Sequence, residues 1–335
     1  MQTARLYLLL TSIAFFSFNA FAQSDTALVN RYDKMYASEK YELALKTAEI
    51  ICDRYPESAT WHFNAGALYA KLGHPLKAIA ALQTCADNQY TGIASFEQNS
   101  DLDPIRDRDE FKVILKTVRS NAQARMDEFQ REAKRHNPKL YIPKSSTEKP
   151  PLVIALHGTG MDGQSMFNAI KDTCVNLGAI LIAPDALRPS GPGFSWTYRD
   201  ESKWFVNYLI KDAVENHNAD PDRVILIGFS QGANIALILG QTQPETFLAV
   251  VPICGHYEAQ NAQATGSPSP FYLISGARDP WKKTYIKAKN DFTAAGGQVQ
   301  TRILAGKGHQ LPTGNSGTKE YTKALTWALK QSGSD

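Results

Sequence analysis

The chain has no long run of one charge and no cluster of metal-binding residues. Its 36 Lys and Arg residues nearly balance its 33 Asp and Glu residues, giving a formal net charge of +3 that is spread along the chain. This distribution does not favour nucleic acid or an anionic membrane surface as a partner. The four cysteines form no C-x-x-C motif and no Cys/His cluster, so we expect no metal site.

Long apolar runs are also scarce, and the one that matters lies at the N-terminus. Arg5 precedes an apolar segment at 6–18, and a small-x-small pattern ends at Ala22. This arrangement predicts a signal peptide at 1–22 that is cleaved to leave Gln23 first. An uncleaved anchor is the alternative, but a membrane span needs ~20 apolar residues. We therefore expect an exported protein, periplasmic or secreted, with no membrane span after cleavage.

An exported protein can form disulfides, because its compartment is oxidising. Its cysteines are Cys52, Cys85, Cys174 and Cys254. Four cysteines allow three full pairings, and spacing does not choose among them. Cys174 and Cys254 lie in apolar surroundings, which equally suits buried free thiols.

Residues 23–135 have the pattern of a small all-α helical-repeat domain. Ala44 and Ala78 occupy matching places 34 residues apart, which is the tetratricopeptide period. The repeat has small residues at three of its positions, matched here by Gly66, Gly73 and Ala78. It has an aromatic and a large residue at two others, matched by Tyr69 and Leu82. The segment therefore resembles a tetratricopeptide module, which implies a protein or peptide partner on its concave surface. An amphipathic helical bundle with no binding role is the alternative.

The next stretch, 136–151, contains helix-interrupting prolines and is predicted to be a linker. A short edge strand at 141–143 is compatible with its sequence. From 152 to 332, short apolar runs alternate with segments long enough for helices. These runs are 152–156, 179–183, 224–227, 248–253, 271–274 and 299–304. The pattern predicts a mostly parallel, doubly wound α/β sheet, whose ligands bind at the carboxyl ends of the strands.

The sequence Gly228-Phe229-Ser230-Gln231-Gly232 fits the G-x-S-x-G motif that presents a nucleophilic serine. An apolar strand precedes it and a helical pattern follows it. Such a sharp strand-to-helix turn needs small residues on both sides of the serine, because a Cβ atom there would crowd the neighbouring backbone. We therefore predict that Ser230 is the nucleophile.

Two further residues complete a Ser, acid, His order along the chain. Asp279 follows the 271–274 run, and His309 follows the 299–304 run. An imidazole activates the serine hydroxyl, and a buried carboxylate orients the imidazole. We predict these roles for His309 and Asp279, with Asp291 or Asp185 as the alternative acid. The alternative for His309 is that it is a loop histidine with no catalytic role.

An oxyanion hole is expected from the loop that follows the first strand of this domain. The sequence His157-Gly158-Thr159 lies there, and its glycine lets the backbone approach a substrate. We predict backbone N–H donors at Thr159 and Gln231, with Gly158 as the alternative to Thr159. His157 is expected to support the loop by hydrogen bonds rather than to act as a second base.

These motifs together resemble the α/β-hydrolase superfamily. Within it, Leu156-His157-Gly158 and the pentapeptide around Ser230 resemble the phospholipase/carboxylesterase group, and the Trp204–Val224 stretch resembles the secreted polyhydroxybutyrate-depolymerase-like esterases. The resemblance implies a serine esterase that works through an acyl-enzyme without a cofactor. Its substrate would be a small-molecule or polymeric ester.

Other functions remain open at this point. The same triad supports peptidases and thioesterases, and a non-catalytic or bifunctional protein could use its helical repeats to recruit a partner. The aromatic-rich segment 188–204 forms either a rim over the pocket or a cover on the sheet.

Overall fold

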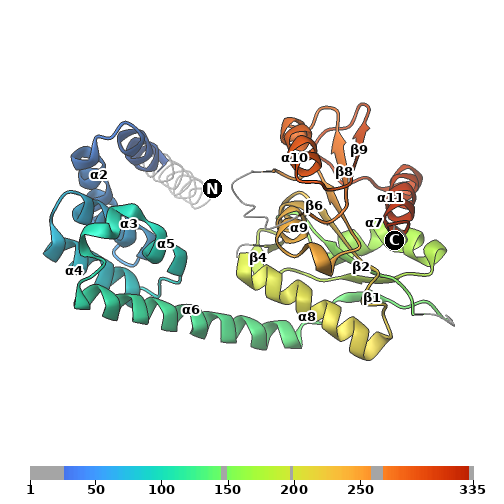
Figure 1. Ribbon diagram of the computed structural model, residues 1–335, viewed down its shortest axis with the longest axis horizontal. Coiled ribbons are helices and arrows are strands. Elements are labelled where there is room, and N and C mark those ends of the chain that lie inside the picture. Colours follow the sequence, from blue (N-terminus) through green and yellow to red (C-terminus); the bar gives the residue numbers. More distant parts are fainter. Residues whose placement is uncertain (1–25, 145–148, 197–198, 258–266, 332–335) are drawn as a thin grey trace, which may run out of the picture. The chain divides into compact units, whose positions relative to one another are not determined.

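The computed structural model describes residues 26–144, 149–196, 199–257 and 267–331. The chain forms two compact units, Met1–Glu128 and Phe129–Asp335, which Figure 1 shows in ribbon form. The signal peptide and its cleavage position after Ala22 lie outside the described residues. In the part of the chain that is described, no helix is both long and apolar enough to cross a bilayer.

The first unit is helical. Residues 26–37 form a helix in the described part of the chain. The helices that follow are α2 (Tyr41–Arg54), α3 (Ala59–Lys71), α4 (Pro75–Asp87), α5 (Ile93–Gln98), the 3-10 helix η1 (Ser100–Ile105) and α6 (Asp109–Arg135). The expected helical N-terminal region is therefore confirmed.

Helices α3 and α4 pack closely at one small residue. A Cβ atom on Gly66 of α3 would lie 2.7 Å from Cγ of Leu82 in α4, so glycine permits the contact. Helices α2 and α4 begin 34 residues apart, and Ala44 and Ala78, one in each, are fully buried. The assignment of this region to the tetratricopeptide repeat stays a prediction.

The end of α6 packs within the second unit. Its Phe129 ring meets the rings of Trp204 and Phe205 edge-on, at centroid distances of 6.4 and 6.1 Å. The strand β1 (Lys139–Tyr141) follows, inside the stretch expected to be a linker. It pairs antiparallel with β3 (Ile180–Ala183), so the edge strand lies two residues earlier than expected and is part of the main sheet.

The second unit is built on a seven-stranded sheet in the order β1-β3-β2-β6-β7-β8-β9. Every pairing in it except β1 with β3 is parallel. Its remaining strands are β2 (Leu152–Leu156), β6 (Val224–Phe229), β7 (Ala249–Ile253), β8 (Phe271–Gly276) and β9 (Val299–Leu304). This confirms the mostly parallel sheet, and each strand lies within two residues of its expected ends. Strands β4 (Arg188–Ser190) and β5 (Gly193–Ser195) form a separate hairpin that the sequence did not reveal.

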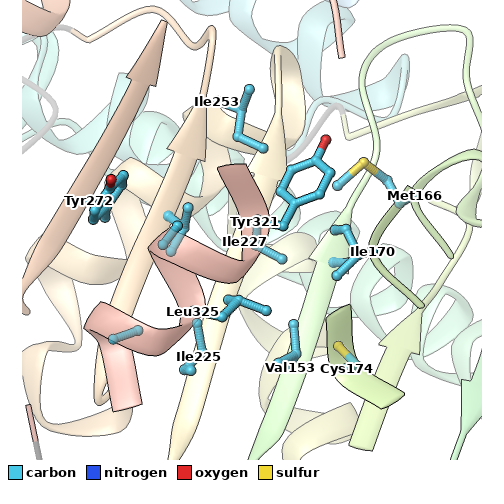
Figure 2. Packing of buried hydrophobic residues seen from close by; sticks show 14 of the residues in the cluster. Val153, Met166, Ile170, Cys174, Ile225, Ile227, Ile253, Tyr272, Tyr321 and Leu325 are labelled. Carbon is cyan, nitrogen blue, oxygen red and sulfur yellow. The ribbon is translucent and has the colours of Figure 1, made fainter. Parts of the chain in front are cut away.

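Helices cover both faces of the sheet. They are α7 (Gly163–Leu177), α8 (Arg199–His217), α9 (Gln231–Thr242), α10 (Lys282–Ala294) and α11 (Gly314–Leu329), with a short 3-10 helix η2 (Pro244–Thr246). Figure 2 shows Met166 and Ile170 of α7 and Tyr321 and Leu325 of α11 packed together over the face that carries Ile227. Burial of such continuous apolar layers stabilises the fold by about 25 cal/mol per Å² of apolar surface.

The strand order reverses at β2. From β2 the chain passes through α7 to β3 on one side, and then through α8 to β6 on the other side. The connections after β2 and β6 therefore lead to opposite sides of the sheet. In open α/β sheets this switch point is where ligands bind.

Candidate active site

Ser230 lies at the turn between β6 and α9, at the carboxyl end of β6 beside the switch in strand order. Its backbone has φ 53° and ψ −115°, a region that non-glycine residues rarely adopt. Its N–H donates to the carbonyl of Ile253 at 2.9 Å, which holds the turn against β7. Such a strained residue, fixed by its surroundings, is common at functional sites.

The two glycines of the motif make this turn possible. A Cβ atom on Gly228 would lie 2.3 Å from the carbonyl oxygen of Gly232. One on Gly232 would lie 2.4 Å from the carbonyl oxygen of Leu156, on β2. Any larger residue would push the nucleophile turn away from the neighbouring strand.

The structure brings Ser230, His309 and Asp279 into contact. His309 Nε2 lies 2.9 Å from Ser230 Oγ, and His309 Nδ1 lies 2.9 Å from Asp279 Oδ2. Since the carboxylate accepts the Nδ1 proton, Nε2 is left to accept the proton of the serine hydroxyl. The Asp279 side chain is fully buried, whereas 32% of the His309 side chain is exposed.

The alternative acids lie elsewhere and are engaged with other groups. Asp291 accepts hydrogen bonds from Tyr257 Oη at 2.8 Å and Lys287 Nζ at 2.6 Å. Asp185 accepts the backbone N–H of Gly163 at 2.6 Å. Among the described contacts, Asp279 is the carboxylate that meets His309.

Sequence reasoning missed the residue that lets the Asp279 and His309 loops meet. These loops leave the neighbouring parallel strands β8 and β9, and Gly276 ends β8. A Cβ atom on Gly276 would lie 2.3 Å from the carbonyl oxygen of Gly308. The Arg278 N–H also donates to the Lys307 carbonyl at 2.8 Å, which ties the loops together. A glycine between an apolar strand and a candidate acid was the only signal in the sequence.

The loop that carries the predicted donor Thr159 passes close to the serine, and the second predicted donor, Gln231, directly follows it in sequence. A Cβ atom on Gly158 would lie 3.1 Å from Cβ of Ser230, so the loop after β2 passes close to the nucleophile. In the described part of the chain, the backbone N–H groups of Thr159 and Gln231 have no protein acceptor. Gln231 is the first residue of α9, where the helix dipole favours negative charge.

His157 is fully buried and uses both ring nitrogens in hydrogen bonds to the backbone. Its Nε2 accepts the N–H of Ala186 at 2.9 Å, which places the ring proton on Nδ1, 2.8 Å from the carbonyl oxygen of Gly158. Burial lowers the pKa of His157, so the ring stays neutral. This geometry suits a residue that supports the loop.

One group of possible metal ligands lies within the described residues, and it overlaps the triad. The ligand atoms of Cys254, Asp279 and His309 lie within 4.8 Å of one another. Metal binding needs a thiolate, but burial raises the pKa of the Cys254 thiol to about 12. Asp279 and His309 already bond to each other, so the group fits a hydrogen-bonded relay better than a metal centre. All four cysteines carry free thiols.

Among the described residues of the aromatic segment 188–204, Trp196 is a buried ring that packs against the core. Trp196 is 5% exposed and packs between His157 and Phe205, at centroid distances of 5.3 and 6.4 Å. Its indole N–H donates to the carbonyl oxygen of His157 at 2.9 Å. At Trp196, covering the sheet is therefore the correct alternative. Tyr198 lies outside the described residues.

Comparison with solved structures agrees with this topology. A Bacillus cereus carboxylesterase superimposes with a TM-score of 0.50 and 19% sequence identity, covering 62% of this chain and 99% of its own. The fold is that of an α/β-hydrolase. At this identity the likeness concerns the fold alone.

Sequence comparisons point to esterases. The BD-FAE family model matches residues 139–267, which include His157, Thr159 and Ser230 but end before Asp279. A feruloyl esterase B of Neurospora crassa is 29% identical over 146 residues, 39% of this chain and 47% of its own. An acetylxylan esterase of Coprinopsis cinerea is 27% identical over 123 residues, 33% of this chain and 32% of its own. The chain thus spans less than half the length of these curated relatives.

Proposed function

We propose that this α/β-hydrolase is an exported serine esterase that cleaves carboxylic esters through an acyl-enzyme. The observation that carries the proposal is the 2.9 Å contact between Ser230 Oγ and His309 Nε2, with Asp279 on the far side of the same ring. The similarity to enzymes named as esterases supports it.

The proposed reaction follows from this geometry. Ser230 Oγ attacks the ester carbonyl carbon while its proton passes to His309 Nε2, and the buried Asp279 carboxylate stabilises the imidazolium. The carbonyl oxygen becomes an oxyanion beside the N–H groups of Gln231 and Thr159. The intermediate then collapses, and His309 protonates the departing alcohol. Water, activated by His309, attacks the acyl-enzyme in the same way and releases the carboxylic acid.

The substrate class is part of the proposal. The relatives are named for feruloyl and acetylxylan esters, so aryl-acrylic and acetyl esters are the first substrates to compare. The signal peptide predicted at 1–22 supports an enzyme that meets such esters outside the cytoplasm, periplasmic or secreted. A partner on the helical unit would serve to position a polymeric substrate.

Replacing the nucleophile tests the proposal. We expect Ser230→Ala to abolish hydrolysis of p-nitrophenyl acetate and labelling by a fluorophosphonate probe, while circular dichroism shows an unchanged fold. The matched control is Ser316→Ala, whose hydroxyl donates only to the Thr313 carbonyl of its own turn, and it should keep full activity. A folded wild-type protein that neither turns over esters nor takes the label would contradict the proposal and favour a non-catalytic binding protein.

A further inference from the structure

The β4–β5 hairpin pairs directly with the loop that carries Thr159. The N–H of Gly160 donates to the carbonyl of Phe194 at 2.9 Å, and the N–H of Phe194 donates to the carbonyl of Met161 at 2.8 Å. A Cβ atom on Gly193 would lie 2.3 Å from the Met161 carbonyl oxygen, so glycine permits this close pairing. The hairpin therefore fixes the backbone on the C-terminal side of Thr159.

The far end of the same hairpin is bound by the side chain of Gln231. Its Oε1 accepts the Ser195 hydroxyl at 3.0 Å and the Trp196 backbone N–H at 2.8 Å. The Trp196 indole in turn donates to the carbonyl oxygen of His157, on the N-terminal side of Thr159. These partners are buried, with Ser195 7% and Trp196 5% exposed, so water does not compete freely for the bonds.

These contacts join two loops that otherwise come from separate strands. The Thr159 loop follows β2, the Gln231 turn follows β6, and each supplies one oxyanion donor under the proposed function. Two donors stabilise a transition state only when both are held about 3 Å from the place where the oxyanion forms. A connection between the loops would supply that preorganisation.

We propose that the Gln231 side chain is a positioning residue that sets the spacing of the two oxyanion donors through the β4–β5 hairpin. The inference rests on the proposed function. In this arrangement one residue acts twice: its backbone N–H faces the oxyanion, and its amide oxygen holds the hairpin that carries the Thr159 loop.

The test is Gln231→Met, which keeps the backbone N–H and the side-chain length but removes the acceptor. The matched control is Gln241→Met, on the same helix, where the amide only donates to the Leu237 carbonyl. With p-nitrophenyl acetate, we expect Gln231→Met to lower kcat at least about tenfold, but by less than the 10²–10³ that loss of a whole donor costs. KM should change less than about twofold. Gln241→Met should match the wild type.

Three further measurements separate positioning from general support. The inhibition constant of a trifluoromethyl ketone, which forms a tetrahedral adduct on the serine, should rise by the same factor as kcat/KM falls. The pH–rate midpoint should not move, because the triad is intact. Ser195→Ala should lower kcat in the wild type and have no added effect in Gln231→Met, because both break the same connection.

The outcomes distinguish this inference from the proposed function. The positioning role would be overturned if the wild type is active and Gln231→Met has the same kcat. It would also be overturned if Gln231→Met has a lower kcat but binds the inhibitor as tightly as the wild type does. Either result would leave the esterase assignment standing. If Gln231→Met does not fold, Ser195→Ala alone decides instead, because it removes the hydroxyl that donates to the Gln231 amide oxygen. A kcat and inhibitor affinity equal to wild type in Ser195→Ala would then overturn the inference, and parallel losses would support it.

Discussion

Asp279 and His309 meet across two loops that leave neighbouring strands, with Oδ2 2.9 Å from Nδ1. The second carboxylate oxygen of Asp279 accepts the backbone N–H of Trp281 at 2.7 Å. The carboxylate is thus held from both sides inside the protein, whereas the imidazole is partly exposed to solvent. This one contact determines which ring nitrogen of His309 faces Ser230.

We expect Asp279→Asn to lower kcat by about 10³–10⁴-fold with the fold intact, because an amide lets the imidazole adopt the wrong tautomer. Initial rates on p-nitrophenyl acetate at neutral pH measure the effect. Asp291→Asn is the control, since Asp291 binds Tyr257 and Lys287 rather than His309. Equal losses in the two variants would contradict the assignment of the acid.

Gly276→Ala should lower kcat/KM, because it disturbs the contact between the two loops that carry Asp279 and His309. Its new methyl group would meet the Gly308 carbonyl oxygen at 2.3 Å and displace the His309 loop. The matched control is Gly308→Ala in that loop, where nothing lies within 4 Å of the added Cβ. We expect at least about a hundredfold loss of kcat/KM for Gly276→Ala, in keeping with the sensitivity of catalysis to ~1 Å misplacements. Unchanged kinetics would show that the loop does not depend on this contact.

The helical unit contains an ion pair with a buried carboxylate, and loss of the pair should destabilise the unit. Lys71 Nζ lies 2.7 Å from Oδ1 of Asp101, whose side chain is 3% exposed. We expect Lys71→Met to lower the free energy of unfolding by about 3 kcal/mol, because it leaves a buried carboxylate without its cation. Urea denaturation followed by far-UV circular dichroism measures this.

The control for this prediction is an exposed pair in the same unit. Lys112 and Asp109 lie 3.1 Å apart with side-chain exposures of 60% and 95%. Lys112→Met should therefore change the free energy of unfolding by less than about 0.5 kcal/mol. A similar loss in both variants would mean that burial of Asp101 does not govern the effect.

Glu320 should make stability depend on acid pH. The Arg302 guanidinium binds it through two hydrogen bonds of 2.7 and 2.9 Å and lowers the pKa of Glu320 below its usual 4.5. Because the folded-state pKa is the lower one, this stabilisation is present above pH 4.5 and is lost as the pH falls through the folded-state value. Glu320→Gln should cost about 1 kcal/mol at pH 7, since Arg302 is 41% exposed and partly screened.

Denaturation at a series of pH values checks the sign. The difference between the wild type and Glu320→Gln should shrink as the pH falls below 4.5. Glu215→Gln is the control, because Glu215 belongs to an exposed pair with Lys211 and should cost little at any pH. A difference that grows toward acid pH would be inconsistent with the lowered pKa.

The strands of the main sheet were predictable because their apolar runs are local signals. Strands with both faces buried need continuous apolar residues, and turn residues bound each run. The strand β1 lacked that signal, since Lys139, Leu140 and Tyr141 are partly exposed at the sheet edge and acquire strand structure from pairing with β3. The β4–β5 hairpin was missed for the same reason: its three-residue strands are held by contacts with the Met161 loop rather than by their own pattern.

The sequence by itself predicted Ser230, Asp279 and His309 as a candidate triad, because each lies shortly after an apolar strand in the order that an α/β-hydrolase requires, but it left Asp291 and Asp185 as alternative acids. It also determined the helical N-terminal region, through small residues at matching places such as Ala44 and Ala78. Tertiary structure alone decided which carboxylate contacts His309. It also decided that both ring nitrogens of His157 hydrogen-bond to the backbone. The same holds for the Gln231 side chain, whose hydrogen bonds connect two loops. These are contacts between segments far apart in the chain, so they depend on how the strands are ordered in the sheet, which no local pattern contains.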